Sequence, residues 1–399
     1  MNQNVDGDLR LTGWTIVLLT CVVNGNPINR LECAKRTHSS RSWPYKGRKI
    51  VFVHHLLRLT LSLMLTAAAG LATAQSNNTG TLAGQIPAVK VGVSGRPDQA
   101  SLELALYRGY WKRQGLDVSL VGAGTSAQDA VSALATDQIQ VSGGSPSAGF
   151  FNALARGIDL RIVADWSHMQ SADDSTFAFL VRSDLIDSGR VKSFADLKGL
   201  TIAAGPVKGG YNDLFLALVL AKGHLTMADI NPAFLAFPDG LAALASKKLD
   251  AALLIEPTVT QAESQGIAKV LAKAGEVDPG AQVATLFYSP AFAAQTDVAT
   301  KFMVGYLQGV RDFYDAFHLK KNQEAAIAIL TKAMPFDPKV WHNTRWSSTD
   351  LNGKINPASI KAQGAFYKEE GLINGPVPDI EKYIDMRFAD AAVKIIGPR

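Results

Sequence analysis

The sequence predicts an α/β protein with two lobes, each a doubly wound sheet, followed by additional C-terminal helices. The chain has 399 residues, which is more than one hydrophobic core usually serves. Apolar residues make up 47% and charged residues 19%, and this composition excludes intrinsic disorder. Strand and helix patterns also alternate in two separate sets, which is typical of α/β proteins with parallel strands.

The first set begins at Val89. A helical spacing of apolar residues follows its first strand, with Leu102, Ala105, Leu106 and Tyr110 on one face. The four strands predicted in this set are Val89–Val93, Leu116–Val121, Ile139–Ser142 and Leu160–Ala164. Their order along the chain predicts parallel strands joined by right-handed crossovers.

The pattern restarts near residue 200. The four strands predicted in the second set are Leu200–Ala204, Phe234–Phe237, Ala251–Ile255 and Ile267–Leu271. Two extended segments, Thr176–Arg182 and Val283–Tyr288, flank this set, as expected for a double hinge between lobes. From Thr296 onward the apolar spacing is helical, and we expect these helices to pack on the first lobe.

These patterns divide the chain into regions. Lobe 1 is predicted from residues 88–180 together with 286–399, and lobe 2 from residues 181–285. Residues 53–74 read as a signal peptide, because a short apolar run ends in an A-x-A cleavage pattern. Residues 1–52 hold both cysteines, and we interpret them as an extension from a translation start assigned too early. Cleavage of the signal predicts a periplasmic protein without cysteine.

The positive charge of the chain belongs to its N-terminal region. The net charge is +5, but residues 1–74 contain nine basic and three acidic residues, which leaves 31 basic and 32 acidic residues elsewhere. The remainder therefore lacks the basic composition of nucleic-acid-binding proteins. We expect no nucleic-acid partner.

Small polar loops follow the predicted strands, where open α/β sheets bind their ligands. Most of these loops lead into a helix, whose free N–H groups would suit an oxyanion such as a carboxylate or sulfonate. The candidate ligand-binding residues are Arg96, Asp98, Gln99, Thr125, Ser126, Ser145, Ser147, Trp166, Lys208, Gly209, Gly210, Tyr211 and Glu256.

Each candidate also has a structural alternative. The serines and threonine can cap helices, the cations can be solvated, and the paired glycines can serve a turn with positive φ. Trp166 and Tyr211 either stack on a ligand or pack in the core. Glu256 and Asp165 would accept N–H groups from an amine or aminopyrimidine, and Glu256 has the alternative of bonding the hinge backbone.

Motifs for other functions are incomplete. Residues 122–127 fit G-x-G-x-x-A, but no acidic residue follows at the next strand end, as a dinucleotide site requires. The histidines after residue 74 lie far apart without metal-binding spacing, and no G-x-S-x-G motif of Ser hydrolases occurs. We therefore expect no cofactor, no metal and no catalytic residues.

Several segments resemble the nitrate/sulfonate/taurine-type solute-binding proteins of ABC importers, a family that includes binders of thiamine pyrimidine precursors. They are Val89–Gly95, Gly109–Lys112, Gln114–Val118, Phe194–Gly199, Lys248–Ala251 and Glu256-Pro257. The resemblance covers about residues 88–290. It implies a two-lobed type II periplasmic-binding-protein fold, a small-molecule ligand in the interlobe cleft, and an inner-membrane permease as partner.

We therefore predict the periplasmic binding component of an ABC importer, a monomer without enzymatic activity. Its expected ligand is a small organic anion, either a sulfonate, a carboxylate or an aromatic compound. The alternative is a pyrimidine-precursor-binding protein or an enzyme of the thiamine pyrimidine branch, although that branch relies on cysteine and histidine. A ligand sensor for a membrane receptor is a third interpretation.

Overall fold

A computed structural model describes residues 86–399, except 123–126 and 207. The predicted extension (1–52) and signal peptide (53–74), and the candidates Thr125 and Ser126, lie outside the described residues. The described residues all belong to one compact unit. Within the described residues, no helix has the length and apolar character needed to cross a membrane.

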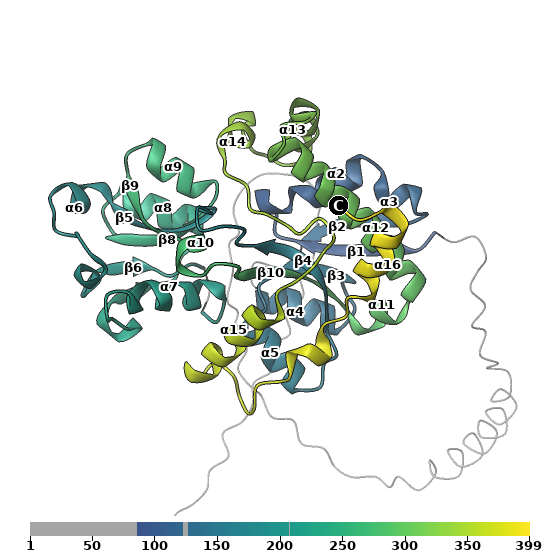
Figure 1. Ribbon diagram of the computed structural model, residues 1–399, viewed down its shortest axis with the longest axis horizontal. Coiled ribbons are helices and arrows are strands. Elements are labelled where there is room, and N and C mark those ends of the chain that lie inside the picture. The colour runs from purple at the N-terminus through teal and green to yellow at the C-terminus, as the bar shows by residue number, and fades with distance from the viewer. Residues whose placement is uncertain (1–85, 123–126, 207) are drawn as a thin grey trace, which may run out of the picture. The chain divides into compact units, whose positions relative to one another are not determined.

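Lobe 1 is built around a five-stranded sheet of order β2-β1-β3-β10-β4 (Figure 1). Its strands are β1 (Ala88–Val93), β2 (Asp117–Gly122), β3 (Val141–Gly144), β4 (Arg161–His168) and β10 (Gln282–Tyr288). Strand β1 pairs in parallel with β2 and β3, whereas β10 lies antiparallel between β3 and β4. The strand inserted between β3 and β4 is therefore the last one in the sequence.

Helices from both ends of the described chain cover the lobe 1 sheet. The N-terminal ones are α2 (Ala100–Tyr107), α3 (Tyr110–Arg113), α4 (Ala127–Ala135) and α5 (Ala148–Ala155). The C-terminal ones are α11 (Pro290–Ala294), α12 (Thr296–Phe317), α13 (Gln323–Ala333), α14 (Pro338–Asn343), α15 (Pro357–Glu369) and α16 (Arg387–Ile396). Helix α12 packs against α2, α3 and α16, and Trp111 stacks on Phe302 at a centroid distance of 5.0 Å. The predicted packing of the C-terminal helices on lobe 1 is confirmed.

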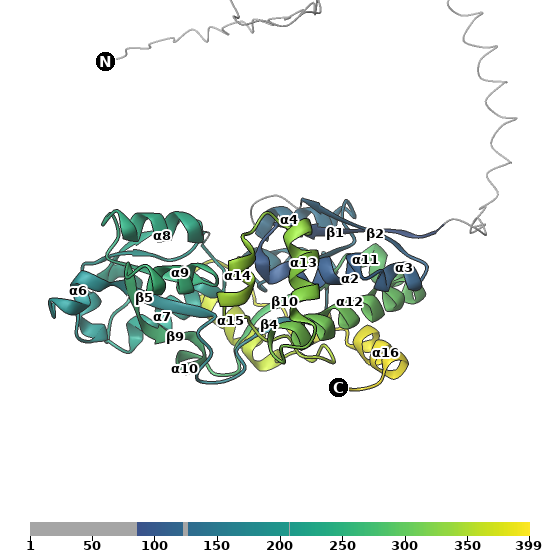
Figure 2. The same ribbon diagram turned by 90° about the horizontal axis from the view of Figure 1, so that it is seen from above.

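Lobe 2 is built around a second five-stranded sheet of order β7-β6-β8-β5-β9. Its strands are β5 (Phe177–Arg182), β6 (Thr201–Ala203), β7 (Asn231–Ala233), β8 (Ala251–Ile255) and β9 (Ala268–Lys273). Its helices are α6 (Ser183–Asp187), α7 (Tyr211–Ala221), α8 (Phe237–Ala245), α9 (Thr258–Ser264) and α10 (Ala274–Val277). In the view of Figure 2, α8 and α7 lie on opposite faces of this sheet. Short 3-10 turns cover Pro97–Gln99, Phe194–Leu197, Met227–Asp229 and Ile380–Tyr383.

Both sheets contain parallel and antiparallel strands, whereas the strand–helix alternation predicted only parallel strands. Strand β5 runs antiparallel to its neighbours β8 and β9, as β10 does in lobe 1. The chain passes between the lobes next to these two strands, and each lies second from one edge of its sheet and runs against the prevailing direction. The predicted boundaries of the lobes stay a proposal.

The predicted strand over residues 234–237 is wrong. The edge strand β7 ends at Ala233, and helix α8 already begins at Phe237. Pro238 lies in the first turn of that helix, where the missing backbone N–H has no intrahelical partner to lose.

Candidate functional site

A cavity of about 490 Å³ lies between the lobes and is lined by strand ends and loops of both. Lobe 1 contributes the loops after β1 and β3 and the end of β4. Lobe 2 contributes the first residues of α7 and α8 and the end of β8, and the segment after α14 completes the wall. This volume lies in the range of pockets that hold drug-sized ligands.

Nine of the thirteen candidate residues lie in the cavity wall. These are Arg96, Asp98, Gln99, Ser145, Ser147, Trp166, Gly210, Tyr211 and Glu256. Lys208 and Gly209 are outside the wall. Lys208 is exposed to solvent, and the Gly209 carbonyl accepts from the Ala148 N–H at 2.8 Å. Gly209 has a φ of 87°, so its glycine serves the turn. Ligand contact by the residues in the wall stays a prediction.

The backbone N–H groups of the loop after β1 donate to a side chain of the same segment, that of Gln99. Gln99 Oε1 accepts from the N–H groups of Ser94, Gly95 and Arg96 at 3.0, 2.9 and 3.3 Å. Gln99 is 5% exposed, so its amide oxygen occupies the position where a bound oxyanion was expected. This N–H cluster is therefore already satisfied.

The arginines of the wall are paired with carboxylates. Arg96 Nε donates to Asp98 Oδ1 at 3.0 Å. Arg345 Nε donates to Glu256 Oε1 and its Nη2 donates to Glu263 Oε2, both at 2.7 Å. Sequence reasoning missed Arg345, because it lies in an irregular segment after α14 that carries no motif.

Glu256 is a buried carboxylate that also accepts hydrogen bonds from a residue of lobe 2. Its side chain is 5% exposed and accepts from the Thr260 N–H at 3.0 Å and from the Thr260 hydroxyl at 2.8 Å. With Arg345 as third donor, Glu256 has partners within the protein on both oxygens. The donors Thr260 and Arg345 lie on α9 and after α14, so the carboxylate bonds neither of the two partners expected from the sequence, an amine ligand or the hinge backbone.

Two hydrogen bonds with main-chain donors join the lobes beside the cavity. The Tyr211 N–H of α7 donates to Ser145 Oγ at 3.2 Å, and the Ala148 N–H of α5 donates to the Gly209 carbonyl. Ser147 caps α5 by accepting from the Phe150 N–H at 3.3 Å. The lobes are thus in direct contact, with helix starts from each next to the cavity.

Aromatic residues from both lobes line the cavity. Trp166 is 5% exposed and stacks on Tyr306 at a centroid distance of 6.3 Å. A Cβ atom at Gly143 would lie 1.9 Å from the Trp166 ring, so glycine alone allows the indole this position. Four further rings in the wall were not predicted: Phe177, Phe237, Phe287 and Trp346.

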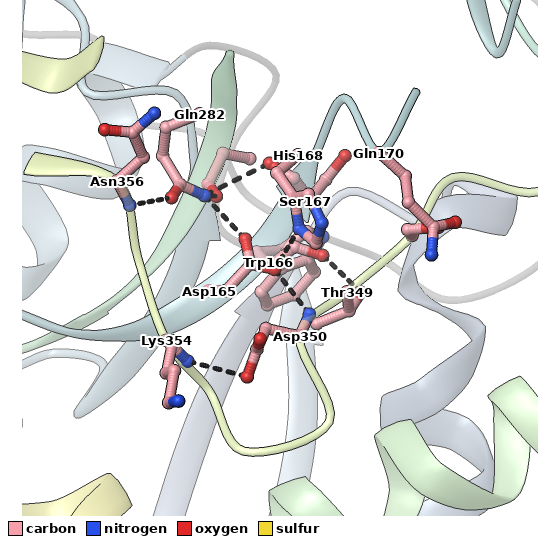
Figure 3. Close-up of polar contacts among 12 residues, drawn as sticks. Asp165, Trp166, Ser167, His168, Gln170, Gln282, Thr349, Asp350, Lys354 and Asn356 are labelled. Carbon is pink, nitrogen blue, oxygen red and sulfur yellow. Dashed lines mark hydrogen bonds and ion pairs between the residues drawn. The ribbon is translucent and has the colours of Figure 1, made fainter. Parts of the chain in front are cut away.

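Asp165 belongs to a buried polar network at the passage between the lobes (Figure 3). Its Oδ1 accepts from Gln282 Nε2 at 2.5 Å, and its Oδ2 accepts from the Asp350 N–H at 2.6 Å. His168 Nδ1 lies 2.7 Å from the same Oδ2, and Gln282 Oε1 accepts from the Asn356 N–H at 2.8 Å. The network ties β4, β10 and the C-terminal segment together. Asp165 is not part of the cavity wall.

The charge of Asp165 acts on His168 within this network. Burial lowers the pKa of His168, but the hydrogen bond and charge of Asp165 outweigh it and raise the pKa above the usual value. Among the described residues, no group of three or more His, Cys, Asp or Glu side chains is placed to hold a metal ion.

Comparison with known proteins places this architecture in a family. Residues 96–316 match the NMT1/THI5-like family, whereas no curated protein matches the chain significantly. The alkanesulfonate-binding protein SsuA from Xanthomonas axonopodis pv. citri, bound to MOPS, has a TM-score of 0.59 at 21% identity and covers 75% of this chain and 98% of its own. The periplasmic nitrate-binding protein NrtA from Synechocystis PCC 6803 has a TM-score of 0.61 at 14% identity, covering 78% and 90%.

An enzyme also shares the fold. The desulfurization enzyme DszB has a TM-score of 0.53 at 13% identity and covers 78% of this chain and 99% of its own. At such identities these structures establish the type II periplasmic-binding-protein fold, which confirms the predicted fold class. The family match spans more than half of the sequence. The chain therefore belongs to the NMT1/THI5-like family.

Proposed function

We propose that this protein is the substrate-binding component of an ABC importer in the periplasm. It captures a small organic molecule between its lobes and delivers it to a permease in the inner membrane. The observation that carries this proposal is the cavity whose wall is drawn from both lobes. The family match and the names of the sulfonate- and nitrate-binding neighbours support it. We further propose that it acts as a monomer.

The proposed ligand is an organic acid, a sulfonate or a carboxylate, or an aromatic compound. The likeness to a protein bound to MOPS supports a sulfonate, and the aromatic wall supports a ring. A pyrimidine precursor is the alternative ligand, supported by the family match.

Closure of the lobes is the proposed mechanism. Chain segments between β4 and β5 and between β9 and β10 connect the lobes, and the Asp165–Gln282 network fixes the lobe 1 end of this connection. A ligand that contacts both lobes binds the closed form better than the open form, and so shifts the population toward closure. The permease would recognise the closed form.

The exported protein, purified from the periplasm, tests this proposal. Sulfonates, aromatic carboxylates, nitrate and pyrimidines are screened for a rise in melting temperature, and any ligand is then released and identified. A binding component raises its melting temperature with at least one compound and returns that compound unchanged. The proposal fails if the bound compound is recovered as a different product.

A second candidate, an enzyme, rests on the likeness to DszB and on the His168–Asp165 pair. Asp165 orients the imidazole as a carboxylate does for a general base. Neither residue lies in the cavity wall, however, which favours binding over catalysis. Turnover during incubation with the ligand identified above would establish the enzyme instead.

A further inference from the structure

Aromatic residues line the cavity from both lobes and present only their edges or small parts of their surface to it, since the most exposed of the five in the core, Phe237, is 8% exposed. Lobe 1 contributes Trp166, Phe287 and Trp346, and lobe 2 contributes Phe177, Tyr211 and Phe237. Aliphatic residues such as Val131, Leu134 and Ile255 also line the cavity. A planar ring between the lobes would meet aromatic and aliphatic carbon on both sides, and such contacts add stacking to the burial of apolar area.

The size of the cavity also favours a ring. At about 490 Å³ it would leave a nitrate or sulfate ion surrounded by water, because these ions have only a few heavy atoms. Each partially filled region would forfeit contacts with the apolar wall. A molecule of one or two fused rings uses this space.

The charged groups of the described wall are already occupied. Arg96 is paired with Asp98, and Arg345 is paired with Glu256 and Glu263. An anionic head that took Arg345 for itself would leave the buried Glu256 without its cation, and unpaired buried charges are costly. The N–H groups of residues 94–96 are likewise held by Gln99. The wall therefore gains little from the charge of a ligand.

We infer that the cleft selects its ligand by an aromatic ring system and not by the charge of the head group. This inference rests on the proposed function as a binding component. Neutral and anionic derivatives of one ring bind within about tenfold of each other. Oxyanions without a ring bind at least a hundredfold more weakly.

Matched probe pairs test the inference by calorimetric titration of the exported protein. The ring probes are benzenesulfonate with benzenesulfonamide, and naphthalene-2-sulfonate with its sulfonamide; the ringless probes are methanesulfonate, acetate, nitrate and sulfate. We expect both members of each ring pair to bind with higher affinity than every ringless anion. The inference is overturned if a ringless anion binds as tightly as the ring probes, if only the anionic member of each pair binds, or if no ring probe binds.

The same titration separates the two proposals. A ringless anion that binds and is recovered unchanged overturns the inference and leaves the binding component intact. A ring probe that binds and is converted to product supports ring selection. It overturns the proposal of a binding component and indicates an enzyme.

Two neighbouring phenylalanines provide a matched pair of variants. Phe237 lies in the wall at 8% exposure, whereas Phe234 is 41% exposed and outside it. Phe237→Ala should weaken the tighter ring probe about tenfold, and Phe234→Ala should leave it unchanged. Equal affinities of the two variants overturn the inference. If Phe237→Ala does not fold by circular dichroism, Trp346→Leu takes its place with the same expected loss.

Discussion

The Arg345 guanidinium donates to the Glu256 carboxylate at 2.7 Å and thereby joins the C-terminal segment of lobe 1 to the end of β8 in lobe 2. The same side chain reaches Glu263 on α9 at 2.7 Å. In the open form proposed above, the lobes separate and these ion pairs are broken. They are therefore part of the free-energy difference between the closed and open forms.

Arg345→Ala should weaken ligand binding by about 5- to 30-fold, which corresponds to about 1–2 kcal/mol. The reason is that the closed form loses an interlobe contact and leaves Glu256 with one donor residue fewer; the partial exposure of Arg345 limits the loss. Calorimetric titration with the ligand found by thermal screening measures it. Arg161→Ala removes an ion pair with Asp159 outside the cavity wall and should bind normally. Identical dissociation constants for both variants would contradict the role of Arg345.

The buried Asp213 side chain should make the free energy of unfolding depend on pH. Its Oδ2 accepts from the Gly209 N–H at 2.6 Å, whereas Oδ1 is buried without a hydrogen-bond partner among the described residues. Burial raises the pKa of Asp213 to about 6. The folded protein then binds a proton more tightly than the unfolded chain, so the free energy of unfolding falls as pH rises from about 4 to 6, by up to about 3 kcal/mol.

Urea unfolding at several pH values from 4 to 7.5 checks this dependence. Asp213→Asn keeps an acceptor for Gly209 and removes the titration, so its unfolding free energy should change less with pH over this window. A pH slope identical to that of the unmodified protein would contradict the prediction.

Gly143 and Gly144 should respond differently to alanine. A Cβ atom at Gly143 meets the Trp166 ring at 1.9 Å, whereas at Gly144 the nearest atom, on Phe287, is 4.0 Å away. Gly143→Ala should therefore lower the free energy of unfolding by about 1–3 kcal/mol and displace the indole, with weaker ligand binding. Gly144→Ala should stay close to the unmodified protein. Denaturation and the tryptophan emission maximum distinguish the two, and a neutral Gly143→Ala would refute the close packing.

Gln282 should matter more for stability than a similar glutamine nearby. Gln282→Met removes the amide that donates to the buried Asp165 carboxylate, which is 0% exposed, and should cost about 2–3 kcal/mol. Gln170→Met removes the contact to Ser348 at 2.5 Å from an exposed position and should cost less than about 0.5 kcal/mol. Urea titration compares the variants; equal costs would show that the hinge network contributes little.

Local patterns predicted much of the fold. Alternating strand and helix signals gave the elements of both lobes, because burial of one face imposes its period on the sequence. The direction and position of β5 and β10 did not follow, since pairing between strands distant in sequence leaves no local period. An apolar run such as β10 reads the same whether it lies at an edge or in the centre of a sheet.

The site was predictable where it follows strand ends. The positions of Ser145 and Glu256 in the cavity wall were predictable because loops after parallel strands meet at one edge of a sheet, and Trp166 lies near the end of β4. Phe287 and Arg345 were not, because one lies on the inserted strand and the other in a segment that reaches the cavity only through tertiary packing.

The position of β10 also constrains the order in which the molecule assembles. The lobe 2 sheet is complete once residue 273 has emerged, because all of its strands are contiguous in sequence. The lobe 1 sheet lacks the strand that joins β3 to β4 until residue 288 follows, and β3 and β4 have no bridge between them before that point. During synthesis from the N-terminus, all strands of the lobe 2 sheet are therefore available before those of the lobe 1 sheet. Until β10 is made, β3 and β4 each have an edge without a partner strand.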